Sequence, residues 1–137
     1  MVILLLIITA LLWGATPILE KTGLTHVDPL TAVTIRSAIV TAGLLALTFL
    51  LGKFKALTEL DGKSFLIFGA SGLMAGLLGM LTYYTALKAE ATSKIVPIAA
   101  CYPLVTVLFS ALILKEGVTF PRMVGTALIV SGIWLVK

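Results

Sequence analysis

Five apolar runs dominate this chain, and each is about as long as a helix that crosses a lipid bilayer. They cover approximately residues 2–19, 29–51, 64–87, 92–114 and 119–136. About twenty apolar residues in a helix span the hydrocarbon core. Water is excluded as the solvent for these runs, because 60% of the residues are hydrophobic and only 12% are charged, against about 25% in soluble domains. The sequence therefore predicts an all-α integral membrane protein with five transmembrane helices in a single domain, residues 1–137.

Charge and the rare residue types exclude several classes of function. The net charge is +4, but the basic residues lie in short connectors rather than in the patch that a nucleic-acid surface requires. The single histidine, His26, lies in a loop beside Asp28, without the cysteines or carboxylates of a metal site or catalytic triad. We therefore expect no nucleic-acid partner, no cofactor, no metal and no enzymatic activity. The single cysteine, Cys101, is expected to pack inside an apolar helix.

Polar and turn-forming residues mark the helix boundaries. The first run has no basic residue before its apolar stretch and continues directly into Trp, Pro and Glu, so we expect a retained membrane helix rather than a cleaved signal peptide. Asp28 followed by Pro29 is a strong start signal for the second helix. The other start candidates are Asp61 and Ser64 for the third helix and Thr92 or Ser93 for the fourth. The fourth helix is expected to stop at Gly117, and the fifth to start near Pro121.

The basic residues are almost evenly divided between the two membrane faces. We define side A as the face that holds the N-terminus; five helices then place Lys53, Lys55, Lys63, Lys115 and Arg122 on side A. Side B receives Lys21, Lys88, Lys94 and Lys137, and Arg36 lies nearest to it. Because the Lys and Arg bias sets orientation, this near balance favours insertion both ways up. The alternatives are that a single basic residue is enough to orient the chain, or that so small a count carries no information about orientation.

The order of features along the chain resembles one transporter family. Residues 83–137, "YYTALKAEATSKIVPIAACYPLVTVLFSALILKEGVTFPRMVGTALIVSGIWLVK", and the N-terminal "LLWGATPILEKTGL" followed by Asp28-Pro29 and Arg36 resemble the EamA-like transporters of the drug/metabolite transporter superfamily. That resemblance implies two five-helix repeats of opposite orientation, of which this chain holds one. It implies an antiparallel homodimer in the inner membrane of a prokaryotic cell, or a heterodimer with a sister five-helix protein.

Three helices carry patterns that permit a functional reading and a packing reading. Thr9, Trp13, Thr16 and Glu20 share one face of the first helix, where they either bond neighbouring helices or line a cavity. Small residues at helical spacing in the third helix predict close helix packing or a sliding surface; they are Gly69, Gly72, Gly76 and Gly79. In the fourth helix, Pro97 and Pro103 predict a break near a site, although membrane helices also tolerate proline in general.

Arg36 is the one charge inside a long apolar run. It lies about seven residues, or roughly 10 Å, from the side-B start of the second helix. Three interpretations stay open: the side chain snorkels to the interface, it forms a structural ion pair with Glu20, or it faces a cavity and attracts the carboxylate or phosphate of a substrate. Glu20 also lies near side B and is the closest counter-ion.

The resemblance implies a secondary transporter that moves a small amphipathic metabolite, such as an amino acid, by alternating access between protomers surrounded by membrane lipids. The transport pathway is expected to use Trp13, Thr16, Arg36, Tyr83, Tyr84, Pro97 and Tyr102. Small multidrug exporters of the superfamily carry a mid-membrane Glu in the first helix; here Glu20 lies near the interface, so facilitated flux or coupling through Glu20 is favoured. The alternatives are a carrier or flippase of lipids or lipid-linked molecules and a non-transporting accessory subunit of a five-helix heterodimer.

Overall fold

A computed structural model describes residues 1–136, and this part of the chain is helical with no strand. The elements are α1 (Val2–Leu24), α2 (Pro29–Leu50), α3 (Phe54–Thr58), α4 (Gly62–Ser71), the π-helix η1 (Gly72–Gly79), α5 (Met80–Ala89), α6 (Thr92–Ala99), α7 (Tyr102–Ile113) and α8 (Phe120–Val136). Lys137, which the charge count places on side B, lies outside the described residues.

Four segments of the described chain are long and apolar enough to cross a membrane. They are Val2–Leu24, Pro29–Leu50, Gly62–Ala89 and Thr92–Ile113. Helix α8, with 17 residues, extends about 25 Å at 1.5 Å per residue, slightly less than the hydrocarbon core of about 30 Å. The chain is thus a multi-pass membrane protein, as the apolar runs predicted, and a crossing by the fifth helix stays a prediction.

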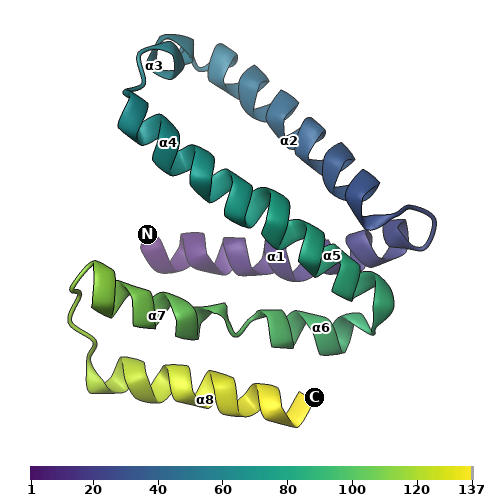
Figure 1. The fold of residues 1–137 in the computed structure, drawn as a ribbon, viewed down its shortest axis with the longest axis vertical. Helices are drawn as coiled ribbons and strands as arrows, with labels where there is room; N and C mark the ends of the chain where they lie inside the picture. The colour runs from purple at the N-terminus through teal and green to yellow at the C-terminus, as the bar shows by residue number, and fades with distance from the viewer. Residues whose placement is uncertain (137) are drawn as a thin grey trace. The chain divides into compact units, whose positions relative to one another are not determined.

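The chain forms two compact units, Met1–Lys88 and Ala89–Lys137. In the first unit, α2 and α4 are joined through α3 at one end, whereas α1, α2 and α5 come together at the other (Figure 1). The buried apolar side chains of this unit gather where α1, α2 and α5 meet; they are Leu24, Val33, Tyr84 and Leu87. We call this region the junction. It is the packed core of the first unit.

In the second unit, α6 and α7 follow one another and α8 packs along both (Figure 1). The fourth span is broken at Ala100 and Cys101, between α6 and α7. This confirms the break predicted from Pro97 and Pro103, because Pro103 has no N–H to donate to the carbonyl of residue 99. The prediction that Cys101 packs inside an apolar helix is wrong, because the break places this residue at the N-cap position of α7, where it is exposed.

The start of α2 matches the prediction closely. The Asp28 carboxylate accepts a hydrogen bond of 3.0 Å from the backbone N–H of Thr31, with Pro29 at the first helical position. Hydrogen bonds from the Thr31 side chain and backbone hold the pKa of Asp28 below its usual value. Asp61 caps α4 in the same way by accepting from the N–H of Ser64.

Other boundaries differ from the prediction. Helix α1 continues to Leu24 instead of ending near residue 19, because Leu24 packs at the junction and tertiary packing outweighs the one hydrogen bond that Pro17 removes. The N-cap of α6 is Ala91, without a side-chain cap, so the caps predicted at Thr92 or Ser93 are wrong. Thr92 and Ser93 already lie inside α6, because the backbone changes from extended at Ala91 to helical at Thr92.

Candidate functional site

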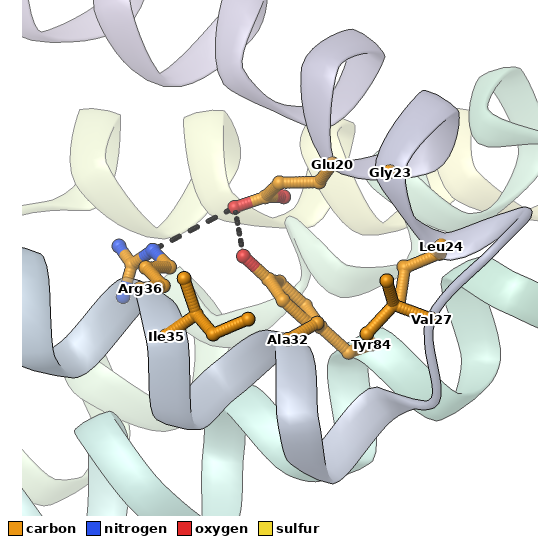
Figure 2. Close-up of a pocket in the computed structure, with 8 residues that line it drawn as sticks. All are labelled: Glu20, Gly23, Leu24, Val27, Ala32, Ile35, Arg36 and Tyr84. Atoms are coloured by element: carbon orange, nitrogen blue, oxygen red, sulfur yellow. Dashed lines mark hydrogen bonds and ion pairs between the residues drawn. The ribbon is translucent and has the colours of Figure 1, made fainter.

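The polar centre of the junction is the carboxylate of Glu20, near the C-terminal end of α1. Its Oε1 accepts a hydrogen bond of 2.8 Å from the Tyr84 hydroxyl. The same oxygen lies 3.8 Å from Nε of Arg36. Figure 2 shows Glu20 between these two side chains, one from α2 and one from α5. The structure therefore brings together three residues that are distant in sequence, including two of the predicted pathway residues.

Burial divides these groups unevenly. The side chain of Glu20 is 9% exposed and that of Arg36 is 42% exposed, whereas Tyr84 is 3% exposed. The contact with Tyr84 has the ordinary length of an O–H···O hydrogen bond. The contact with Arg36 is about 1 Å longer than such a bond. Glu20 is thus fixed by Tyr84 and only loosely paired with Arg36.

Lysines at the ends of α1 and α5 hold these helices in place. The Lys21 ammonium donates to the carbonyl oxygens of Leu87 at 2.7 Å and of Lys88 at 3.1 Å. Lys88 donates to the carbonyl of Val27, at 2.8 Å. Cations at a helix C-terminus satisfy carbonyls that have no partner within the helix. These contacts tie α5 to α1 and to the α1–α2 loop, and they fix the position of Tyr84 relative to Glu20.

A cavity of about 240 Å³ opens beside the charged pair. Its lining consists of Glu20, Gly23, Leu24, Val27, Ala32, Ile35, Arg36 and Tyr84. One part of the wall carries charge and a hydroxyl, and the remainder is apolar. Such a surface can hold a molecule that has a polar head and an apolar body. A neighbouring cavity of about 310 Å³ is lined by Lys21, Leu24, Thr25 and Lys88.

The polar stripe of α1 reaches this cavity only through Glu20. The hydroxyls of Thr9 and Thr16 donate to carbonyls of their own helix, Leu5 at 2.9 Å and Leu12 at 2.7 Å. Trp13 is 66% exposed. The stripe residues Trp13 and Thr16 are therefore not part of the cavity wall, and their role in a pathway stays a prediction.

The remaining predicted pathway residues lie in different surroundings. Tyr83 is half-buried and its ring centroid lies 6.1 Å from that of Tyr84. Pro97 lies inside α6 and Tyr102 is the first residue of α7, so they stand on the two sides of the break in the second unit. Tyr102 is 57% exposed.

The glycine face of the third span does not pack against another helix of the first unit. A Cβ atom added to Gly69, Gly72 or Gly76 would have no atom of that unit within 4 Å. At Gly79 the same atom would lie 3.1 Å from the carbonyl oxygen of Met74, within η1 itself. Inside this unit, the absence of a side chain at Gly79 thus leaves room for the Met74 carbonyl of the π-helix. A packing role of the glycines toward another chain stays a prediction.

Sequence reasoning included the Glu20–Arg36 pair among its interpretations, but it did not identify the other contacts that hold the site. Lys21 and Lys88 were counted only as topology charges, and Tyr84 was expected to line a pathway rather than to bind Glu20. A basic residue in the last turn of a helix was the available signal, since such residues often bind free carbonyls. Among residues 1–136, no three His, Cys, Asp or Glu side chains gather in a group that could hold a metal ion.

Comparison with known proteins gives a consistent result over the whole chain. The model of the EamA-like transporter family matches residues 1–137. The uncharacterized protein MJ1333.1 of Methanocaldococcus jannaschii is 34% identical over 95 residues, 69% of this chain and 69% of that protein. A Sinorhizobium protein described as an uncharacterized transporter in the cobO 3' region is 24% identical over 126 residues, 92% of this chain and 89% of the relative. No solved structure matches significantly.

Proposed function

Because this chain belongs to the EamA-like transporter family, we propose that it is a secondary transporter of small amphipathic metabolites, amino acids or similar solutes, in the cytoplasmic membrane of a prokaryotic cell. It works by alternating access, and it is not an enzyme. The family establishes a membrane transporter in general terms. The solute class and the mechanism are our proposal.

One observation carries the solute class: the Glu20–Arg36 pair borders a cavity whose other walls are apolar. Ligand pockets generally combine an apolar lining with a few polar groups that fix orientation. Ionisable residues inside membrane spans are rare, because they are costly there, and they commonly mark substrate pathways. A solute with one polar head and an apolar body satisfies both parts of this wall.

We further propose that two copies pair head to foot, so that each completes the pathway of the other. The near balance of basic residues supports insertion in both orientations. The relative from Sinorhizobium has nearly the same length, since the match covers 92% of this chain and 89% of that protein. Irregular backbone such as that at Ala100 and Cys101 is tolerated at membrane depth only where protein or a water-filled cavity covers it, and a second copy supplies this cover. A sister five-helix protein is the other candidate partner.

Transport is tested with the purified chain in proteoliposomes, by uptake of radiolabelled amino acids and of radiolabelled short-chain monocarboxylates. We expect uptake above that of protein-free vesicles, and a loss of at least about tenfold in Arg36→Gln, since a charged hydrogen-bond donor is removed. Arg122→Gln, in the first turn of α8, is the matched control and keeps wild-type uptake. Vesicles that scramble labelled phospholipid but take up no solute would instead identify a lipid carrier.

Pairing is tested with reporters at the C-terminus that are active on opposite sides of the membrane. Comparable activity of both reporters, together with crosslinks between copies of opposite orientation, is the expected result. Activity of only one reporter, in cells without a companion five-helix protein, would contradict the antiparallel pair.

A further inference from the structure

We infer that Arg36 binds the carboxylate of a solute with an apolar body, and that the nearby carboxylate of Glu20 competes with that solute for Arg36. The inference rests on the proposed function, because it names the chemical class that the cavity at the junction accepts.

Most of the hydrogen-bonding capacity of Arg36 is unused. A guanidinium presents five N–H donors in a rigid fork that fits a carboxylate through two parallel hydrogen bonds. Glu20 contacts only Nε, and at 3.8 Å. Within residues 1–136, the two terminal amino groups of this guanidinium bond no protein group, and 42% of the side chain is exposed. The fork is therefore available to a carboxylate that enters the cavity.

Glu20 keeps a hydrogen-bond partner when Arg36 binds a solute. Its Oε1 is held by the Tyr84 hydroxyl at 2.8 Å, so the carboxylate keeps a strong partner when Arg36 turns to a solute. An unpaired charge at this depth would be costly, and the bond from Tyr84 reduces that cost. Arg36 is thus the exchangeable member of the three, and Glu20 with Tyr84 is the fixed pair.

The unequal exposure of Glu20 and Arg36 distinguishes an anionic solute from a zwitterionic one. A free amino acid would place its ammonium on Glu20 while its carboxylate binds Arg36. Glu20 is 9% exposed, against 42% for Arg36, so the cation-binding half of the pair is covered and the anion-binding half is open. The remaining wall offers only apolar side chains, among them Leu24, Val27 and Ile35. The cavity therefore favours a monocarboxylate with a hydrocarbon body.

The experiment measures binding of three probes of one shape to the purified full-length chain in detergent, by calorimetry. Isocaproate carries only the carboxylate, isocaproamide is its neutral analogue, and leucine adds the ammonium. We expect isocaproate to bind more tightly than leucine, and isocaproamide to bind at least about tenfold more weakly, since it lacks the charge that strengthens hydrogen bonds to Arg36.

Four variants distinguish a binding role from a structural one. Glu20→Gln removes the competing and repelling charge but still accepts from Tyr84, so isocaproate should bind at least about threefold more tightly. Arg36→Gln should lose binding, and Arg36→Lys, which keeps the charge without the fork, should weaken it and covers the case in which Arg36→Gln fails to fold. Arg122→Gln is the control and should bind as the wild type does.

Several results would overturn the inference. They are equal binding of isocaproate and isocaproamide, weaker isocaproate binding in Glu20→Gln, leucine binding without isocaproate binding, and no binding of any probe. Each leaves the uptake assay to decide the proposed function separately. Conversely, isocaproate binding with the expected variant pattern but no uptake of any solute would support the site and refute transport.

Discussion

Replacing Tyr84 with phenylalanine removes one oxygen atom from the junction, and with it the 2.8 Å hydrogen bond to Glu20. Tyr84 is 3% exposed, so water cannot readily replace the lost donor. Hydrogen bonds to charged groups contribute about 1.5–3 kcal/mol in proteins, whereas polar contacts between membrane helices average about 0.6 and reach about 1.7 kcal/mol. Since Glu20 keeps Arg36, we expect a loss of about 1–1.5 kcal/mol, roughly a five- to thirteenfold rise in the equilibrium constant for unfolding.

The assay is reversible unfolding in mixed micelles, followed by circular dichroism, on Tyr84→Phe, Glu20→Gln and the double variant. The double-mutant cycle should give a coupling energy of about 1 kcal/mol between these two side chains. Tyr102→Phe is the control, because Tyr102 is 57% exposed at the start of α7, and its effect should stay within about 0.5 kcal/mol. A Tyr84→Phe variant as stable as the wild type, or a coupling energy of zero, would refute the view that this bond holds the junction together.

Three further predictions concern the backbone and the helix caps. Hydrogen bonding at the start of α2 keeps the pKa of Asp28 below its usual value of 3.8, so the stability from this cap is complete above about pH 5 and is lost as the pH falls below that value. Between about pH 7 and pH 3, the melting temperature of Asp28→Asn should therefore fall less steeply than that of the wild type. Equal slopes for the two proteins would contradict this prediction. Gly79→Ala should lower the free energy of unfolding, because its Cβ would lie 3.1 Å from the carbonyl oxygen of Met74. Gly76→Ala should raise the free energy of unfolding by up to about 1 kcal/mol, because its Cβ would enter open space. Shifts of the same sign in the two variants would refute this contrast. Lys115 has φ +54°, a backbone conformation that glycine adopts more easily than other residues. Lys115→Gly should therefore raise the free energy of unfolding by up to about 1 kcal/mol, and Lys115→Val should lower it. The reverse order in the same unfolding assay would count against backbone strain at this residue.

The parts of the fold that depend on local chemistry could be predicted from the sequence. Apolar length located the spans, because a bilayer accepts only segments that bond their own backbone. Asp28 with Pro29 fixed the start of α2 to the residue, since both act within one turn of the helix. Pro97 and Pro103 located the break in the fourth span for the same reason: each removes a backbone donor whatever the surrounding structure is.

The parts that depend on contacts between distant residues could not be predicted in this way. The Tyr84 hydroxyl and Glu20 are 64 residues apart in sequence, and no periodicity indicates which of the two neighbouring tyrosines turns toward α1. The π-helical geometry of η1 and the short helix α3 also escaped prediction. For Arg36, the sequence left three interpretations open, and the 3.8 Å contact with Glu20 was needed to show which group it faces.

The position of the junction has a mechanical consequence for the first unit. All the cross-links described between α1, α2 and α5 lie at one end, whereas α3 at the other end has no buried residue. The helices of this unit are held together at a single end, so displacement should grow along α2 and α4 with distance from the junction. Amide hydrogen exchange should therefore be slowest near Leu87 and fastest around α3. The solute-binding groups at the junction would keep their relative positions while the distant ends of the helices move.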